Sequence, residues 1–405
     1  MGNKIKNTMA QKRWSFLLTL ALFAIPCMRR FFTGKMNAQN TTVFAFSYDY
    51  GFISRGLMGT IWQGLNDILP IDLINYEAIQ TLSKWATFGF LIALLVFYNV
   101  CMKKCDEKNM RMMQYLCCFL SVFSFPNFVS NANFGRLDVY LMIFTIIGCI
   151  LLVKEKWEWL LIPICTLCTV MHHGYVFLYL NIILVLLFYK IIMNDKKRRK
   201  YIVIFGLTFL LPAILFLYFE FFSHPTGNNI YEEIVALSMA LARDGKSYSE
   251  SMVNHEILGM DVFELEWPIH LMNYKETPFF LMLFMVYVVI GIRFLARLIG
   301  KKQGKDKWAY IAVAVGSITV LPQIILKVDY GRYAYAIFFY YIALVMCLVA
   351  MKDAHVIQQL EESMEQAKDK IPAAKLLIVY PLIFMPFLDV SITDLTYEIY
   401  TLLGI

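Results

Sequence analysis

A series of long apolar stretches, each bounded by charged residues, constrains the fold of this chain more than any other feature. An α-helix needs about 20 apolar residues to cross a bilayer, and stretches of roughly that length recur about eleven times. Their approximate ranges are 14–28, 84–102, 112–128, 138–153, 157–171, 175–193, 201–222, 278–298, 308–326, 336–351 and 376–390. We therefore predict an all-α fold, a polytopic helical membrane protein with about eleven transmembrane helices and a single integral membrane domain, residues 1–405.

The composition supports this class and excludes several others. Hydrophobic residues make up 59% of the chain and charged residues only 17%, against about 25% charged residues in an average soluble domain. These values exclude a disordered chain, a collagen-like fibre and a small disulfide scaffold, and they nearly exclude a soluble globular enzyme. Cys165 and Cys168 have the spacing of a redox or zinc pair, but they lie inside an apolar stretch, and we interpret both as packing residues.

The distribution of basic residues predicts the orientation. With the N-terminus in the cytoplasm, most of the 37 Lys and Arg residues fall on the inner side, in agreement with the positive-inside rule. The stretch 14–28 is then a retained first helix and not a cleaved signal peptide. Two long loops, 29–83 and 223–277, lie outside, and a polar helix or loop, 352–375, lies in the cytoplasm. The net charge of +7 is mostly a topology signal, and we expect no nucleic-acid partner.

The first outer loop contains Asp49 and Arg55 among aromatic and apolar residues. Three glycines fall close together around Arg55, and glycine lets the backbone turn sharply or approach a ligand. The following segment, 57–74, is predicted to be an amphipathic helix on the outer surface. This loop is therefore a candidate part of a functional site.

A pair of adjacent histidines, His172 and His173, interrupts an apolar run that is too long for one span. We predict two helices, 157–171 and 175–193, joined by a tight turn at these residues. Either histidine is a candidate general base or hydrogen-bond donor to a substrate. Metal binding ranks lowest, because the spacing of a helical histidine pair with a nearby acid is missing. A single buried histidine is more often a hydrogen-bonded core residue.

The pattern aromatic-Gly-Arg occurs twice, ending at Arg136 and at Arg332. Both arginines stand at the predicted outer start of a helix, with Asp138 and Asp329 close by. An arginine in the first helical turn opposes the helix dipole, so it is better explained if it faces an anion such as a phosphate. The alternative is an interface anchor that reaches the lipid headgroups.

The second outer loop, 223–277, is acidic and aromatic. It is predicted to contain a helix at 231–243, a polar turn at 244–249 and a further irregular or helical stretch. Carboxylates beside aromatic rings suit carbohydrate binding, although a solvated cap over the helices explains the same composition.

The centres of the predicted spans contain no Asp, Glu, Lys or Arg. Ion-coupled carriers and charged pores usually need such groups near the midplane. Their absence favours a protein that works at one face of the membrane, on a substrate that is partly in the lipid.

With this topology, and with Asp49-x5-Arg55, Gly135-Arg136, His172-His173 and Asp329-x2-Arg332 on the outer side, the chain resembles bacterial envelope-polysaccharide enzymes. These are the O-antigen and exopolysaccharide polymerases (Wzy-like) and the wider GT-C-type membrane glycosyltransferases. The resemblance implies a multi-pass protein of the bacterial plasma (inner) membrane that uses sugars linked to undecaprenyl or another polyprenyl (pyro)phosphate. It also implies membrane lipid as surroundings, and other polysaccharide-assembly proteins, for a capsule or another surface polymer, as partners.

The resemblance also implies roles for particular residues. In GT-C enzymes an acidic residue of the first outer loop is the catalytic base, and Asp49 occupies the matching position. The polymerases hold pyrophosphate with outer arginines, a role that Arg136 and Arg332 match. No soluble cofactor and no resident metal are expected, although a GT-C-like enzyme would allow a divalent ion.

Three hypotheses follow. The first is glycosyl transfer or polymerisation at the outer face, with Asp49, His172 or His173 as the base. In it Arg55, Arg136 and Arg332, with Asp138 and Asp329, hold the pyrophosphate. The second is a flippase or transporter for a lipid-linked oligosaccharide. The third is a structural or assembly subunit without chemistry.

Overall fold

The computed structural model describes residues 31–106, 134–259, 277–326 and 330–370, with a few isolated positions before residue 29 and between 109 and 116. The predicted helices 14–28 and 376–390, most of 112–128 and the candidate residue Asp329 lie outside the described residues. All regular structure within the described ranges is helical, which confirms the all-α class for this part of the chain.

The helices are α2 (Ala38–Thr42), α3 (Gly56–Ile68), α4 (Tyr76–Lys104), α7 (Asp138–Lys154), α8 (Leu161–Met171), α9 (Tyr175–Leu178), α10 (Leu180–Met193), α11 (Arg198–Phe221), α12 (Ile230–Leu241), α13 (Glu250–Leu258), α15 (Thr277–Gly300), α16 (Asp306–Val315), α17 (Leu321–Leu326), α18 (Tyr330–Ala350) and α19 (Ala354–Lys370). Short 3-10 segments are η1 (Val43–Ala45), η2 (Tyr48–Tyr50), η4 (Glu158–Leu160), η5 (Asp195–Lys197) and η6 (Gly316–Val320).

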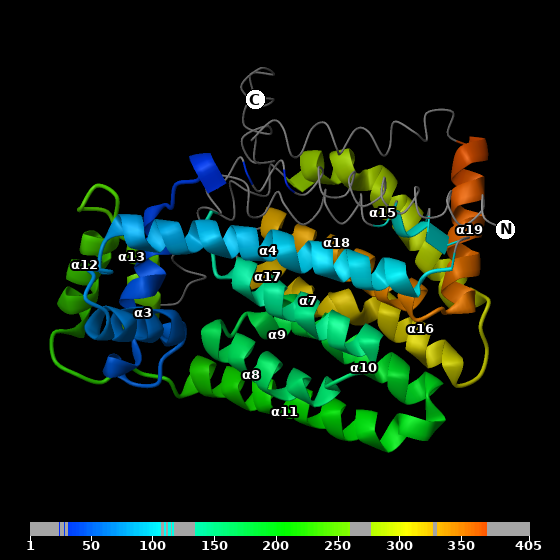
Figure 1. The fold of residues 1–405 in the computed structure, drawn as a ribbon, viewed down its shortest axis with the longest axis horizontal. Helices are drawn as coiled ribbons and strands as arrows, with labels where there is room; N and C mark the ends of the chain where they lie inside the picture. The colour runs from blue at the N-terminus through cyan, green and yellow to red at the C-terminus, as the bar shows by residue number, and fades with distance from the viewer. Residues whose placement is uncertain are drawn as a thin grey trace.

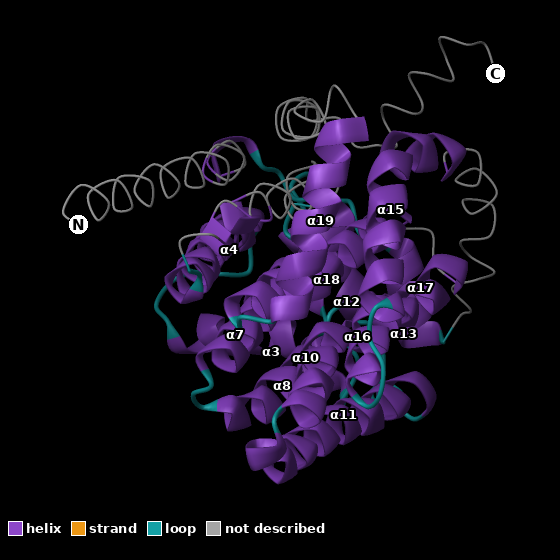
Figure 2. Ribbon diagram, turned by 90° about the vertical axis from the view of Figure 1, so that its right-hand side faces the viewer, coloured by secondary structure: helices purple, strands orange, loops and turns teal. Residues whose placement is uncertain are grey.

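The longer helices run side by side along the longest axis of the molecule. α4 packs against α7, and α10 packs against α7, α11 and α16; Figure 1 shows this bundle. α3, α12 and α13, which belong to the two predicted outer loops, gather at one end, which we call the loop end (Figure 1). α19, in the predicted cytoplasmic segment, stands at the opposite end. Figure 2 shows α10 surrounded by other helices, and α8 and α11 at one edge.

The start and end of α4 illustrate how the sequence sets helix limits. Asn75 caps the helix, because its side chain accepts a hydrogen bond from the Ala78 N–H. Glu77 in the first turn and Lys103 and Lys104 in the last turn complement the helix dipole. The helix therefore begins at Tyr76, before the start of the predicted span 84–102.

Two predicted spans, 175–193 and 308–326, are wrong as continuous helices. The first is divided at Tyr179 into α9 and α10, and the second passes from α16 through η6 into α17. The two breaks lie against each other. The Asn181 Nδ2 atom donates to Thr319 Oγ1 at 2.9 Å, and the Thr319 hydroxyl donates to the Phe177 carbonyl at 3.1 Å. Polar side chains at one break thus form hydrogen bonds with polar groups at the other. Non-helical backbone in an apolar environment needs such hydrogen-bond partners.

By length and composition, two of the described helical segments are able to cross a membrane: Tyr76–Lys104 and Asp195–Phe221. α11 also exposes many large apolar side chains: Ile202, Val203, Leu207, Phe209, Leu210, Leu211, Ile214, Leu217 and Phe221. An apolar surface of this kind is typical of a helix that faces lipid or another protein. The other predicted spans stay a prediction.

Gly59 determines how closely α3 packs on the first outer loop. A Cβ at this position would lie 2.7 Å from the Phe44 carbonyl oxygen and still closer to that of Phe46. Gly64, in the same helix, has open space around it. The absence of a side chain at Gly59 therefore places α3 directly on the backbone of η1.

We expect Gly59→Ala to lower the free energy of unfolding by about 1–3 kcal/mol, because the methyl group must displace backbone. The matched variant Gly64→Ala is expected to raise it by about 0.5–1 kcal/mol, since alanine favours the helix. Thermal unfolding of the purified protein in detergent measures both. Equal effects of the two substitutions would contradict the close packing of α3.

Glu155 connects helices at the end opposite to the loop end. Its carboxylate accepts hydrogen bonds from Lys190 Nζ and from Lys197 Nζ, each at 2.7 Å. These two bonds lower the pKa of Glu155 from 4.5 to about 2. A carboxylate whose pKa is lower in the folded state stabilises the fold above its unfolded pKa. That contribution is lost as the pH falls from about 4.5 toward 2.

We therefore expect wild-type protein to lose thermal stability between pH 5 and pH 3 (about the range in which Glu155 binds a proton in the unfolded state only). Glu155→Gln is expected to be less stable at neutral pH and to show a smaller loss over the same interval. Melting temperatures measured across this pH range test the prediction, and identical pH profiles for the two proteins would refute it.

Candidate functional site

Three segments that are far apart in the sequence meet toward the loop end. They are the first outer loop, the turn before α7 at 134–138 and the histidine turn between α8 and α9. The loop contacts the turn before α7 through Asn40 and the histidine turn through Ser54. Each contains residues that the sequence analysis predicts to be part of a functional site. Their side chains form two groups, one around His173 and one around Asp138.

His173 lies between a hydroxyl group and a carboxylate. Its Nδ1 atom is 2.6 Å from Ser54 Oγ, and its Nε2 atom is 3.9 Å from Glu220 Oε2, near the end of α11. Ser54 is buried, whereas 16% of the His173 side chain is exposed. His173 thus combines a ring orientation set by Ser54 with partial exposure, an arrangement that suits a general base.

His172 has a different environment. Its Nδ1 atom accepts a hydrogen bond from the Gly174 N–H at 3.1 Å, which closes the turn. The His172 ring lies edge-on to that of His173, with 5.4 Å between the ring centroids. His172 therefore shapes the turn that presents His173.

Asp49 is exposed in η2. One of its carboxylate oxygens accepts the Ser47 hydroxyl at 2.9 Å. The loop around it is held by the chain that follows α11, because the Thr226 N–H donates to the Tyr50 carbonyl at 2.8 Å. These hydrogen bonds hold the exposed Asp49 in a defined position. Among the described residues, no contact joins it to His172 or His173.

Arg55 stands in the left-handed backbone region, with φ 61°, immediately before α3. This conformation is uncommon for residues other than glycine and often occurs at functional sites. Its Nη1 atom is 3.2 Å from Glu256 Oε1 in α13, so the two outer loops are joined by an ion pair. A pyrophosphate ligand would have to compete with Glu256 for this guanidinium group.

Asp138 is the centre of the second group. It is 2% exposed, and its Oδ1 atom accepts hydrogen bonds from Arg332 Nε at 2.9 Å and from the Tyr179 hydroxyl at 3.2 Å. The Tyr179 hydroxyl has electrostatic interactions with both Arg136 and Arg332. The buried Asp138 carboxylate is therefore held by one guanidinium group and one hydroxyl group, and the guanidinium group of Arg136 lies near the same tyrosine.

The two arginines differ from each other in their position relative to the helix that follows. Arg332 lies in the first turn of α18, as expected, but α7 begins at Asp138, so Arg136 precedes its helix. The anion that offsets Arg332 against the dipole of α18 is Asp138 itself. The start of α7 in turn favours the negative charge of Asp138.

Several residues in this region carry no signal in the sequence. Glu220 and Glu256 are single acids outside any motif, and Tyr179 is one aromatic residue among many. Ser54 lies between Asp49 and Arg55 in the first outer loop, but its neighbour His173 is distant in the sequence. Only the folded chain brings these residues to their partners.

In the part of the chain that the structure describes, no group of three or more His, Cys, Asp or Glu side chains is arranged to hold a metal ion. Comparisons of the chain with known protein families, with curated proteins and with solved structures found no match.

Because Asp138 and Arg332 form a buried pair, we expect Asp138→Asn and Arg332→Gln each to lower the free energy of unfolding strongly, by about 3–5 kcal/mol. The double variant is expected to lose much less than the sum, since it leaves no uncompensated charge. Chemical denaturation of the four proteins in detergent measures the coupling. Additive losses would show that the pair does not interact in solution.

Proposed function

We propose that this protein is a multi-pass enzyme of the bacterial plasma membrane. In this proposal about eleven helices cross the membrane, and the loop end faces outward. The enzyme transfers or polymerises sugar units linked to polyprenyl (pyro)phosphate for surface-polysaccharide synthesis. The observation that carries the proposal is the ion pair of Arg332 with the buried carboxylate of Asp138, next to the turn that contains Arg136 and in the same part of the molecule as His173.

The membrane setting is supported by the two long apolar helical segments and by the apolar surface of α11. The sidedness is supported by the gathering of the predicted outer elements α3, α12 and α13 at one end, opposite α19 (Figure 1). A site at that end would meet a lipid-linked substrate whose head group lies at the outer surface.

The charge of the Asp138 group suits a pyrophosphate leaving group. Arg332 donates to the Asp138 carboxylate, and both Arg332 and Arg136 lie close enough to influence the Tyr179 hydroxyl that donates to the same carboxylate oxygen. Fixed positive groups at the position where negative charge develops are among the largest contributions to catalysis. Arg136 and Arg332 would provide them. Asp138 would hold Arg332 in place. Asp329 lies outside the described residues.

His173 is the best placed of the three candidate bases. Ser54 fixes one side of its ring, and the Glu220 carboxylate faces the other nitrogen. In the proposed step an acceptor hydroxyl oxygen forms a bond to the anomeric carbon of the donor sugar. The bond from that carbon to the pyrophosphate oxygen breaks with its electron pair, and the acceptor proton moves to His173.

We expect Arg136→Gln and His173→Gln each to lower the amount of polymer in cells by at least about tenfold at normal protein level, because each removes a group that acts in the transition state. Arg293→Gln is the matched control, since Arg293 is exposed and lies in α15, away from both groups. Polymer is quantified from the cell surface and protein by immunoblot. Normal polymer with both variants would overturn this site assignment.

One observation favours the flippase alternative. The breaks at Tyr179 and Gly316 lie against each other within the bundle, and broken helices commonly line the substrate site of transporters. In this chain the two breaks satisfy each other's polar groups, which favours a structural role for them. The flippase stays the second candidate, and the leaflet on which a lipid-linked unit accumulates separates the two.

A further inference from the structure

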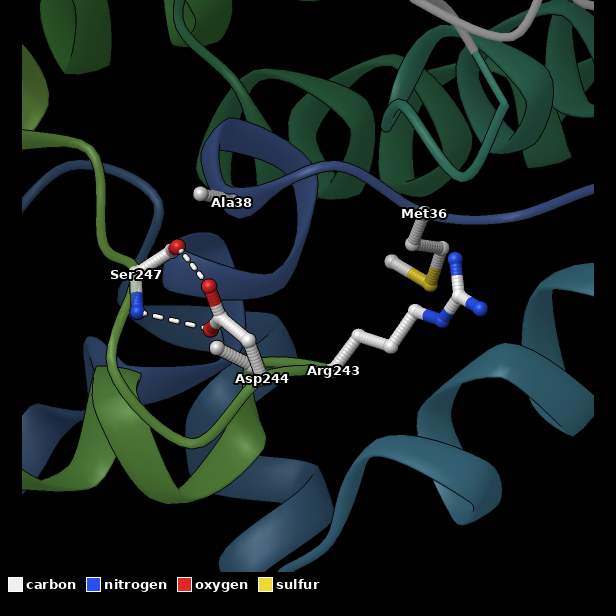
Figure 3. Close-up of a pocket in the computed structure, with 6 residues that line it drawn as sticks. Met36, Ala38, Arg243, Asp244 and Ser247 are labelled. Carbon is white, nitrogen blue, oxygen red and sulfur yellow. Dashed lines mark hydrogen bonds between the residues drawn. The ribbon is translucent and has the colours of Figure 1, made fainter.

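A pocket of about 380 Å³ opens at the loop end, between the start of α2 and the turn that joins α12 to α13. It is lined by Met36, Ala38, Ala242, Arg243, Asp244 and Ser247 (Figure 3). Pockets of this size hold small ligands. The two outer loops each supply one wall, so the pocket exists only when both loops are folded together.

The walls of the pocket are of two kinds. Met36, Ala38 and Ala242 form an apolar surface, and Met36 and Ala242 are buried. Arg243 adds a positive charge to the pocket wall, and Asp244 adds a negative charge. A surface that is apolar on one side and carries hydrogen-bonding groups on the other matches a sugar ring, which has C–H faces and hydroxyl edges.

Asp244 is held in a fixed orientation. One carboxylate oxygen accepts the backbone N–H groups of Lys246 and Ser247, at 3.0 and 2.8 Å, and the other accepts the Ser247 hydroxyl (Figure 3). These bonds, led by that of the Ser247 hydroxyl, lower the pKa of Asp244 to about 2. The carboxylate is therefore ionised at neutral pH, and it accepts hydrogen bonds but does not donate them.

Arg243 is a cation without an acidic partner in the described part of the chain; its described electrostatic contact is with the Tyr76 hydroxyl. Figure 3 shows its side chain extending toward Met36, away from Asp244. A planar guanidinium group binds a carboxylate through two parallel hydrogen bonds. The free charge thus favours a ligand that carries a carboxylate.

The pocket adjoins the turn at 134–138, which contains Arg136, through Met36. A Cβ on Gly135 would lie 2.7 Å from Met36 Cε, so the Met36 side chain packs directly on the residue before Arg136. The same turn is held to the first loop by Asn40, whose Nδ2 atom donates to the Phe134 carbonyl at 2.8 Å. Met36 therefore both lines the pocket and packs on the turn that contains Arg136.

We propose that this pocket binds an acidic sugar residue, a uronate, with its carboxylate on Arg243, its hydroxyl groups on Asp244 and Ser247, and its C–H face on Met36. A phosphate group fits less well, because the fixed negative charge of Asp244 repels a dianion. The role of the pocket as a glycan subsite rests on the proposed function, whereas uronate binding itself does not.

The test is equilibrium dialysis of the purified full chain in lipid nanodiscs against glucuronate, with glucose and inorganic phosphate as comparison probes. We expect glucuronate to bind more tightly than either probe, and Arg243→Gln to weaken its binding by about tenfold or more. Lys246→Gln is the matched control, because this lysine lies in the same turn, is exposed and does not line the pocket. It is expected to bind glucuronate as the wild type does.

Three outcomes would overturn the proposal: glucose binding as tight as that of glucuronate, phosphate binding that is tighter, or an unchanged affinity in Arg243→Gln. Arg136→Gln separates this proposal from the proposed function. If that variant binds glucuronate normally and still makes normal polymer, the enzyme assignment fails and the pocket stands. If wild-type protein does not bind glucuronate while Arg136→Gln loses polymer, the pocket assignment fails and the enzyme stands.

Discussion

The buried contact between Asp138 and Arg332 is the interaction on which the loop end depends. Asp138 begins α7, Arg332 lies in the first turn of α18, and Tyr179 donates to the same carboxylate from the break between α9 and α10. One carboxylate thus joins two helix starts and one helix break.

Burying two charges costs desolvation energy, which is offset only when their hydrogen bonds are satisfied. The dipole of α18 also opposes Arg332, so this arginine is tolerated there because Asp138 faces it. A pyrophosphate that used Arg332 would share it with Asp138.

The first outer loop connects the separate parts of this end. It reaches the histidine turn through Ser54 and the second outer loop through Arg55, and Met36 packs against the turn at 134–138. The close approach of α3 at Gly59 holds the loop in this position. A loop with so many specific contacts is ordered before any ligand binds, which lowers the cost of assembling a site. The His173 group, the Asp138 group and the Arg243 pocket therefore depend on the same segment.

The sequence predicts some of this arrangement well. The limits of α7 and α8 follow from charged and histidine residues at their ends, and both predictions agree with the structure within a few residues. The break at Tyr179 could not be predicted, because the apolar pattern continues across it and its partner is Thr319, far along the chain. The same holds for the contact of His173 with Glu220. Local pattern predicts helices and isolated reactive side chains, whereas pairings between distant segments depend on tertiary packing.

The central claim is that the chain acts on a lipid-linked glycan at the outer face of the membrane. The most direct measurement is the leaflet on which lipid-linked units accumulate in cells that lack the protein, determined by the access of an impermeant glycan-modifying enzyme in intact cells and in opened vesicles. A transferase or polymerase predicts accumulation of short units on the outer leaflet. Accumulation on the inner leaflet alone would contradict the claim and identify the protein as a flippase.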